Sequence, residues 1–521
     1  MDQAVILKAM GDPAFYPDAP AAVTVRETHI STLFLTDRHV YKVKKPVNFG
    51  FLDFTTLSAR RFFCEQEVKL NRRLSPQVYL AVEPIYGDER GIHLEPAGKV
   101  VEYAVKMLRI PESRMMDILL RQGHVDDKIV VQIARKLVDF HSRARSDGET
   151  ALYGTVARVA KNTEENFSQT TGFIGRSLSM AQFEKITAFT RGFLQRKKPL
   201  FRKRVDTGKI RDCHGDIRME HICIIDPIVI FDCIEFNRRF RYSDVAADLA
   251  FLAMDLDFHE RPDLSRTLVQ TYVEEAGDLE LLKVVRFYKC YRAYVRGKVE
   301  SFQAVGETAG PETAKKHLAR AQDYFALAET YAQARPFLVI TSGLTGTGKS
   351  RLAEALAHDL DMSLFQSDRV RKEICGVPPE EHRFAEFGKG IYTKEISQKT
   401  YQALLARARD DLHQGRPVIL DAAYLNVGER REAERLAGEL GVPFFILEVV
   451  CSREEVKRRL ASRLLDGGAI SDGRWEIYLS QQKSRDPISR FPPDRHFVID
   501  TSVIQDGYGQ IEKAILLTVE T

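Results

Sequence analysis

The sequence predicts a chain of two domains: an α+β domain over residues 1–335, then an α/β domain with a parallel sheet flanked by helices over residues 336–521. The length of 521 residues exceeds the size at which one core usually divides. Directly after Pro336, an apolar run, a glycine-rich turn and a periodic helix predict the first unit of a parallel sheet. By contrast, two apolar runs on either side of Asp226-Pro227 predict a hairpin.

The composition is that of an ordinary globular protein, with 44% hydrophobic and 29% charged residues and a net charge of only +4. That charge is too small to indicate a nucleic-acid or membrane partner. The seven cysteines are widely spaced and form no CxxC pair, as expected of reduced core thiols. No signal peptide is evident, and no run approaches the ~18 apolar residues needed to cross a bilayer. We therefore expect a cytoplasmic protein without a membrane partner.

A helix over about residues 312–335 is expected between the two domains. A loop containing glycine and proline, residues 304–312, precedes it. The apolar residues of the expected helix recur at helical spacing, at Leu318, Ala321, Phe325, Ala328 and Tyr331. This helix either closes the first domain or braces the two.

The segment "FLVITSGLTGTGKSRLAEALAHDL" carries a phosphate-binding pattern in its required context, after a strand and before a helix. Glycines let successive backbone N–H groups face phosphates at a helix N-terminus, while a lysine reaches the β and γ oxygens. The following serine hydroxyl can ligate Mg²⁺. The predicted nucleotide-binding residues are Gly343, Thr345, Gly346, Thr347, Gly348, Lys349 and Ser350, the last also as a metal ligand.

Two acidic residues follow later apolar runs of the same domain. "SLFQSD" is expected to form a strand that ends on Asp368, with Arg371 three residues on. At the carboxyl edge of a parallel sheet, Asp368 could deprotonate an acceptor hydroxyl while Arg371 holds the acceptor or a phosphate. "RPVILDAAY" predicts a buried strand ending at Asp421, where a carboxylate would hold magnesium. Helix capping is the alternative for both aspartates.

The segment "CSREEVKRRLASRLLDGG" predicts a helix that begins at a capping box of Ser452 and Glu455. Arg459 and Arg463 share one face of this helix. As catalytic lid residues they would neutralise charge that develops on the phosphates, although an ordinary solvated basic helix fits the pattern nearly as well.

These residues together resemble the small P-loop kinases that include gluconate kinases, zeta-toxin kinases and the kinase part of polynucleotide kinases. The resemblance covers about residues 336–521 and implies a P-loop NTPase fold. The phosphate loop is highly specific for nucleotide binding, whereas the Asp-x-x-Arg pair is only moderately specific for an acceptor hydroxyl.

In the first domain, "RDCHGDIRMEHICIIDPIVIFDCIEFN" would bring the His214-Gly215-Asp216 loop and Asp232 to one end of a hairpin. Phosphoryl transfer to an alcohol needs such a pair, with one carboxylate near the hydroxyl and another holding Mg²⁺. Alone, the His-Gly-Asp motif would be taken for a turn. Upstream, Lys42 and Lys44 lie on one face of the strand "HVYKVKKP", and Glu65 or Glu67 on the next helix could reach either lysine.

Taken in order, Lys42, Glu67, Asp216 and Asp232 resemble the strand lysine, helix glutamate, catalytic aspartate and metal aspartate of aminoglycoside phosphotransferases and their protein-kinase-like relatives. The resemblance spans about residues 25–300 and implies a two-lobed kinase fold. Which of the two strand lysines meets the phosphates is left open. "YKVKKPVNFGFLDF" and "FDCIEFN" are similar to a bacterial family that is often fused to a P-loop kinase.

The resemblance also implies that Asp248 braces the catalytic loop. Two departures stand out. His221 occupies the position of the expected metal-binding Asn, and no glycine-rich loop precedes Lys42. Imidazole is a poorer ligand for hard Mg²⁺ than an amide oxygen is.

We therefore predict a bifunctional ATP-dependent kinase that uses Mg²⁺ and transfers the γ-phosphoryl group to a hydroxyl of a small metabolite. Two alternatives remain open. A nucleic-acid end-processing enzyme would use basic stretches such as "RKKPLFRKR", residues 196–204, to hold a strand. A P-loop kinase with a regulatory, catalytically weak N-terminal domain would bind ATP there without turnover.

Overall fold

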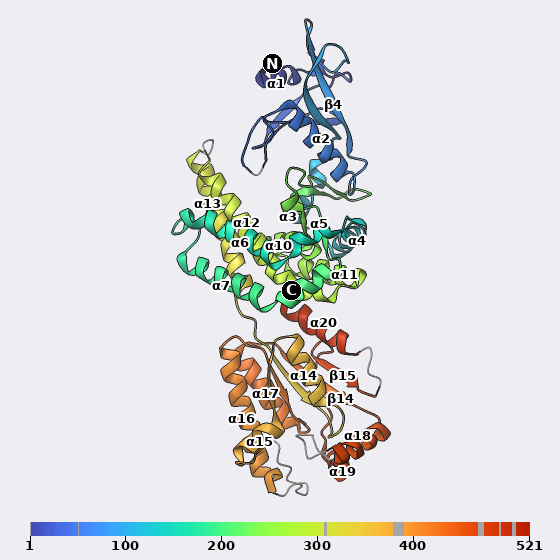
Figure 1. The fold of residues 1–521 in the computed structure, drawn as a ribbon, viewed down its shortest axis with the longest axis vertical. Helices are drawn as coiled ribbons and strands as arrows, with labels where there is room; N and C mark the ends of the chain where they lie inside the picture. Colours follow the sequence, from blue (N-terminus) through green and yellow to red (C-terminus); the bar gives the residue numbers. More distant parts are fainter. Residues whose placement is uncertain are drawn as a thin grey trace. The chain divides into compact units, whose positions relative to one another are not determined.

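The structure is a computed structural model that divides into two compact units, Met1–Ala332 and Gln333–Glu520 (Figure 1). It describes residues 2–50, 52–306, 310–378, 390–466, 474–488, 491–502 and 507–520. Within these residues, no helix combines the length and the apolar character that crossing a bilayer requires.

In the N-terminal unit, helix α1 (Gln3–Met10) precedes a six-stranded antiparallel sheet in the order β1-β2-β3-β6-β4-β5. Its strands are β1 (Thr24–Glu27), β2 (Ser31–Leu35), β3 (His39–Lys44), β4 (Tyr79–Asp88), β5 (Gly91–His93) and β6 (Lys99–Leu108). Helix α2 (Leu57–Asn71) is capped by the Thr56 hydroxyl, which accepts from Ala59 N at 3.1 Å. Cys64 and Val68 of α2 belong to the core that includes Val105 of β6, so α2 covers one face of the sheet.

A helical part follows in the same unit (Figure 1). Its longer helices are α4 (Asp127–Arg143), α6 (Val156–Thr170), α7 (Met180–Arg196), α10 (Val245–Phe258), α11 (Pro262–Ala276), α12 (Leu282–Ala304) and α13 (Pro311–Ala332). Helix α10 is apolar nearly all round and is buried along most of its length, which makes it the centre of this part. Helix α13 packs against α12, and its Tyr324 and Phe325 share a core with Tyr294.

Two small antiparallel pairs carry the acidic loops. Strand β7 (Ile210–Asp212) pairs with β10 (Tyr242–Asp244), and β8 (Ile222–Cys223) pairs with β9 (Val229–Ile230). The predicted hairpin around Asp226-Pro227 is present, but its strands are shorter than the apolar runs suggested. The chain turns at Asp232, where φ is 63°, so the ladder cannot continue into "FDCIEF".

The C-terminal unit is built on a five-stranded parallel sheet in the order β12-β13-β11-β14-β15, which confirms the predicted parallel sheet. The strands are β11 (Leu338–Ser342), β12 (Ser363–Gln366), β13 (Val418–Asp421), β14 (Phe444–Val450) and β15 (His496–Asp500). Both faces are covered, and the strands are near-continuous apolar runs for that reason.

Each face of this sheet has its own core. Leu356 of α14 (Lys349–Asp359) and Ile515 of α20 (Gly507–Glu520) pack on one face. Leu404 of α16 (Lys394–His413) and Leu436 of α17 (Val427–Leu440) pack on the other. Three further helices lie near the carboxyl ends of the strands: α15 (Ser367–Ile374), α18 (Arg453–Asp466) and α19 (Trp475–Ser484).

Candidate active sites

The glycine-rich loop joins β11 to α14 in a backbone conformation that needs glycine at three positions. Gly343, Gly346 and Gly348 have φ values of 152°, 80° and 95°, which side chains rarely allow. A Cβ atom on Gly343 would lie 2.3 Å from the Val449 carbonyl oxygen. The backbone N–H groups of this turn precede a helix N-terminus, which is a ready anion site. The three glycines are therefore required by geometry.

Side chains around this loop hold it in shape. Lys349 Nζ donates to the Leu344 carbonyl oxygen at 2.8 Å, and the Thr347 hydroxyl donates to the same oxygen at 2.9 Å. Thr345 N donates to Gln481 Oε1 of α19 at 2.8 Å. Sequence reasoning missed Gln481, because nothing near it in the sequence points to the loop.

Asp421 ends β13, the strand beside β11, and so lies next to the start of α14. Burial raises the pKa of Asp421, while a hydrogen bond with Ser350 and the charge of Lys349 act in the opposite direction. Thr341 Oγ1 donates to Asp421 Oδ1 at 3.3 Å. A hydroxyl and a carboxylate side by side are oxygen ligands of the kind that Mg²⁺ prefers, so Ser350 and Asp421 fit the predicted metal.

Asp368 lies in the first turn of α15, since β12 ends at Gln366 and not at Asp368 as expected. Arg371 Nη1 donates to Asp368 Oδ1 at 2.9 Å, and the guanidinium lies over the Tyr392 ring, 4.8 Å from its centroid. The charge of Asp368 contributes to the raised pKa of Asp421. The two predicted aspartates therefore lie near each other at one edge of the sheet.

The structure places Arg459 of α18 beside the phosphate loop. Its guanidinium donates to the Thr501 hydroxyl at 2.9 Å and to the Thr501 carbonyl at 2.8 Å. The Thr501 hydroxyl donates in turn to the Thr347 carbonyl at 2.6 Å, an anchor that sequence reasoning missed. Ser452 caps α18 as expected, accepting from Glu455 N at 3.4 Å. The Arg463 side chain lies outside the described residues.

A cavity of about 520 Å³ adjoins the phosphate loop and is lined by Leu344, Thr347, Cys451, Tyr478 and Arg485, among others. Neither Asp368 nor Asp421 lines it. The cavity is therefore separate from the edge where these two aspartates lie.

In the N-terminal unit, Asp248 of α10 organises the His214-Gly215-Asp216 loop. Its carboxylate accepts the backbone N–H groups of His214 at 2.9 Å and Gly215 at 2.8 Å, and lies 3.0 Å from His141 Nε2. Burial acts to raise the pKa of Asp248, but these hydrogen bonds and His141 lower it to about 2. Burial lowers the pKa of the His214 imidazole to about 4.

His141 and Asp248 also meet Cys213 closely enough to hold a metal ion. However, burial raises the pKa of the Cys213 thiol well above its usual range, so the thiolate that a metal needs is disfavoured. The hydrogen bonds of Asp248 are already committed to the loop. This cluster is a structural brace.

Asp216 is paired with Arg218 and lies beside His221. Arg218 Nε and Nη2 donate to its two carboxylate oxygens at 2.9 and 3.2 Å. His221 Nδ1 lies 2.8 Å from the Asp216 backbone oxygen and 3.5 Å from its Oδ2. Burial opposes ionisation, yet Arg218, His221 and the charge of Arg296 hold the pKa of Asp216 well below its usual range. Asp216 is therefore ionised, and Arg218 donates a hydrogen bond to each of its carboxylate oxygens.

Asp232 follows β9, and its backbone N–H donates to the Tyr79 hydroxyl at 3.1 Å. Its carboxylate lies 2.8 Å from Lys42 Nζ and 3.7 Å from His221 Nε2. Lys42 and His221 hold the pKa of Asp232 well below its usual range against the effect of burial. The predicted Asp216, His221 and Asp232 are thus brought together. The Asp232 carboxylate is a ligand of the kind that suits Mg²⁺, and His221 beside it offers a softer nitrogen ligand.

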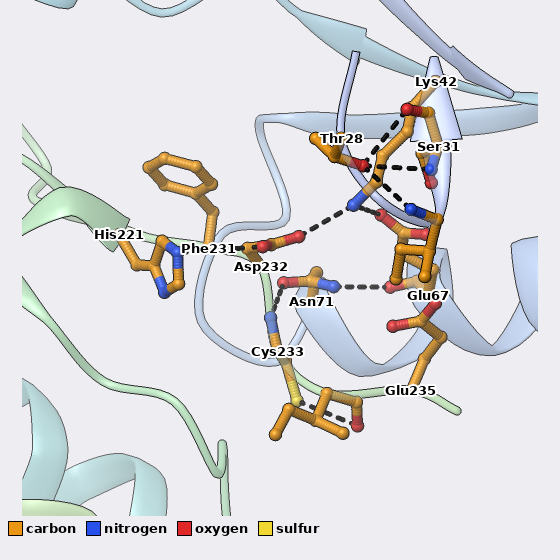
Figure 2. A network of polar contacts seen from close by, with 12 residues as sticks. Thr28, Ser31, Lys42, Glu67, Asn71, His221, Phe231, Asp232, Cys233 and Glu235 are labelled. Carbon is orange, nitrogen blue, oxygen red and sulfur yellow. Dashed lines mark hydrogen bonds and ion pairs between the residues drawn. The ribbon is translucent and has the colours of Figure 1, made fainter. Parts of the chain in front are cut away.

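Lys42 reaches the predicted Glu67 (Figure 2), and Lys44 reaches it as well. Lys42 Nζ lies 2.9 Å from Glu67 Oε1, and Lys44 Nζ lies 2.7 Å from Glu67 Oε2. Lys44 also contacts Glu235, whereas Lys42 contacts Asp232. The Glu65 alternative pairs with Arg61 instead. Sequence reasoning missed the role of Glu235, although an acid three residues after Asp232 was a visible signal.

The basic run over residues 196–204 does not expose all of its charged side chains, as a strand-binding surface would require. Arg204 is fully buried, and its guanidinium contacts Asp244 at 2.5 Å and Asp278 at 3.0 Å. Arg202 is exposed, and Lys203 pairs with Glu280. Part of this charge is therefore neutralised inside the fold.

Comparison with known proteins gives three findings. A family model described as an AAA domain matches residues 338–488. The uncharacterized protein Rv2004c of Mycobacterium tuberculosis and an uncharacterized protein of Mycobacterium bovis are each 32% identical over 461 residues, which cover 87% of this chain and 88% of each relative.

Solved structures with similarity include a gluconokinase from Sinorhizobium meliloti 1021, with 17% identity and a TM-score of 0.25 over 36% of this chain and 94% of that chain. The Mycobacterium tuberculosis APS kinase in complex with AMPPNP and APS has 17% identity and a TM-score of 0.26, over 36% and 99% of the two chains. Both structural similarities are weak by identity and by TM-score.

Proposed function

We propose an ATP-dependent small-molecule kinase for this chain, which belongs to the protein family of the uncharacterized mycobacterial protein Rv2004c. The observation that carries the proposal is the glycine-rich loop between a strand and a helix N-terminus, with three glycines at positive φ, Ser350 and Asp421 beside it and Asp368 at the same sheet edge. The acceptor is a hydroxyl of a small metabolite, and the enzyme is bifunctional, with a second centre in the N-terminal unit.

In the C-terminal centre the loop amides and Lys349 bind the phosphates of ATP. Ser350 and Asp421 would hold Mg²⁺, which supplies neutralisation of phosphate charge when bound. Asp368 takes the proton of the acceptor hydroxyl as its oxygen attacks the γ-phosphorus, and the bond to the β,γ-bridging oxygen breaks to release ADP. Arg371 orients Asp368 or the acceptor. Arg459 lies beside Gly348 and stabilises negative charge on the transferred group.

In the N-terminal centre, which we place in a protein-kinase-like fold, Lys42 leaves Asp232 to bind phosphate oxygens, while Glu67 keeps the lysine in place. Asp232 and His221 would hold the metal. Asp216 acts on the acceptor hydroxyl after Arg218 releases one of its oxygens. The support for this assignment is that these six residues, from distant parts of the sequence, each lie within hydrogen-bond or ion-pair distance of another member and form one connected series.

The first test removes the phosphate-loop lysine. Lys349→Ala should lower ATP turnover in the C-terminal centre by about 10²-fold or more, because the cation on the β and γ oxygens is lost. Turnover is followed with labelled ATP and a metabolite extract in an Asp232→Ala background, which silences the N-terminal centre, and the compound that gains phosphate identifies the acceptor. Lys399→Ala, on the exposed side of α16, is the matched control. Wild-type turnover by Lys349→Ala would contradict the assignment.

The second test separates the two N-terminal carboxylates in a Lys349→Ala background. Asp232→Ala should abolish Mg²⁺-dependent ATP binding by the N-terminal centre, whereas Asp216→Ala should spare that binding and lower transfer by about 10²- to 10⁴-fold. Titration calorimetry measures the binding, with Asp139→Ala, in an exposed ion pair, as the control. Equal effects of the two substitutions would remove the division of roles.

A second candidate is a P-loop kinase whose N-terminal unit binds nucleotide without transfer. The contact of Arg218 with both oxygens of Asp216 favours it, since a base held this way is not free to take a proton. Under this candidate, Asp216→Ala leaves total phosphate transfer unchanged while Asp232→Ala still removes N-terminal ATP binding.

A further inference from the structure

Lys44 and Glu235 form a buried ion pair behind the groups that face the ligand. Lys44 Nζ contacts Glu67 Oε2 at 2.7 Å and also contacts Glu235. The side chains of Lys44 and Glu67 are 0% exposed, and that of Glu235 is 5% exposed. Charges that are removed from water in this way are costly unless they are well paired. Contact with a ligand cannot explain why Lys44 and Glu235 are charged residues, because neither side chain is open to solvent.

The charged groups alternate in sign in the order Asp232, Lys42, Glu67, Lys44 and Glu235. Figure 2 shows Asp232, Lys42 and Glu67 of this series in contact, with Glu235 nearby. Only one end of this series opens to solvent, where the Asp232 side chain is 42% exposed and that of Lys42 is 12% exposed. A nucleotide can therefore touch Asp232 and Lys42. It cannot touch the inner pair.

The inner pair also fixes the loop that carries Asp232. Glu235 anchors the end of the loop to β3 through Lys44, and Cys233 N donates to Asn71 Oδ1 of α2 at 2.9 Å. Asn71 Nδ2 donates to the Glu67 carbonyl oxygen at 2.9 Å, four residues back along the helix. Strand β3, helix α2 and loop 232–235 are thus joined at the same place.

We propose that Lys44 and Glu235 are positioning residues that keep the Lys42 and Glu67 pair assembled before any nucleotide binds. This inference rests on the proposed N-terminal phosphotransferase centre. Each oxygen of Glu67 has its own lysine. When Lys42 turns from Asp232 to a phosphate, Glu67 therefore stays fixed by Lys44, and loop 232–235 stays fixed by Glu235. The centre is consequently assembled constitutively, without a movement of α2.

The test uses the full chain with Lys349→Ala, which weakens the phosphate loop, and measures ATP binding by calorimetry and thermal unfolding by circular dichroism. The Mg²⁺-dependent binding that Asp232→Ala removes is counted as binding by the N-terminal centre. Lys44→Met alone should lower the melting temperature, because it leaves Glu235 buried without its partner. The double variant Lys44→Met with Glu235→Met should recover the melting temperature, since both buried charges are gone. Its ATP affinity should remain about tenfold lower, because Glu67 has lost its second anchor.

The matched control is the double variant Arg60→Met with Glu102→Met. That pair is also buried and also joins α2 to the sheet, with Arg60 Nε 2.9 Å from Glu102 Oε1, but it does not touch loop 232–235. It should retain the ATP affinity of the parent. Recovery of both stability and affinity in the Lys44 and Glu235 double variant would overturn this inference alone. Absence of ATP binding by the parent would overturn the proposed N-terminal centre with it.

Discussion

At the scale of single residues, the buried carboxylates of the N-terminal unit differ in what neutralises them. Asp248 accepts two backbone N–H groups, which cannot swing away, and so its role is structural. Asp232 is held by the Lys42 side chain and is partly exposed, so a ligand can replace that contact. Glu235 is the one of these three in which the effect of burial prevails, and its pKa is raised even though the charge of Lys44 acts to lower it. Whether a carboxylate can react therefore depends on the group that neutralises it, because a ligand can displace a partly exposed side chain but not a backbone N–H group.

Asp248 should make the stability of this unit depend on acidic pH. Its pKa in the folded protein is about 2, against an ordinary value of 3.8. A depressed folded-state pKa stabilises the fold above the unfolded pKa, and this contribution is lost as the pH falls from about 4 to 2. The loss should amount to about 2 kcal/mol in the free energy of unfolding, measured by urea titration across this range.

The comparison for that experiment is Asp248→Asn, which cannot titrate and should show a shallower dependence over the same interval. Asp139→Asn, at an exposed position, should keep the wild-type slope. An Asp248→Asn protein with an unaltered slope would mean that another group causes the acid sensitivity.

At the scale of elements, the phosphate loop is the segment whose conformation tolerates least change. Gly343→Ala would place a Cβ 2.3 Å from the Val449 carbonyl at a φ of 152°. We expect a loss of about 1–3 kcal/mol in stability, together with loss of ATP binding by the C-terminal unit. Thermal unfolding followed by the fluorescence of Trp475, the only tryptophan of the chain, measures this unit selectively.

Gly428 offers the matched control for that substitution. It lies in α17, and a Cβ there would meet nothing within 4 Å. Gly428→Ala should therefore be neutral or raise stability by up to about 1 kcal/mol, through better helix propensity. Equal destabilisation by the two alanines would argue against a special conformation at Gly343.

At the scale of the whole molecule, each unit has a core of its own. The first is closed by α13, whose Ala321, Tyr324 and Phe325 pack with Tyr294 of α12. The second has a core on each face of the five-stranded sheet. Each unit therefore contains apolar packing of its own, as a domain that folds alone needs.

Fragments 1–332 and 333–521 should therefore each unfold cooperatively. The melting temperature of 333–521, read from Trp475 fluorescence, should lie close to that of the same transition in the full chain. A fragment ending at residue 310 lacks α13 and exposes the core beneath it, so it should aggregate or unfold. Failure of both 1–332 and 333–521 to fold would show that the units depend on each other.

The sequence by itself determined the features that are local. Gly343 to Ser350 form a phosphate loop because glycine alone tolerates those backbone angles beside a strand and a helix, and the apolar run ending at Asp421 forms a buried strand of a parallel sheet. Local propensity also placed Lys42 and Lys44 on one face of a strand, because side chains alternate along it.

Only the tertiary structure decided what depends on contacts between distant segments. In the folded chain Lys42 pairs with Asp232, and Lys44 pairs with Glu235. Arg218 pairs with Asp216, and Arg204 of the basic run is buried between two aspartates. The tertiary structure also ended β12 at Gln366 and so moved Asp368 into a helix. The physical reason is that the energy of a charge is set by its burial and its partners, and these come from parts of the chain up to 191 residues apart.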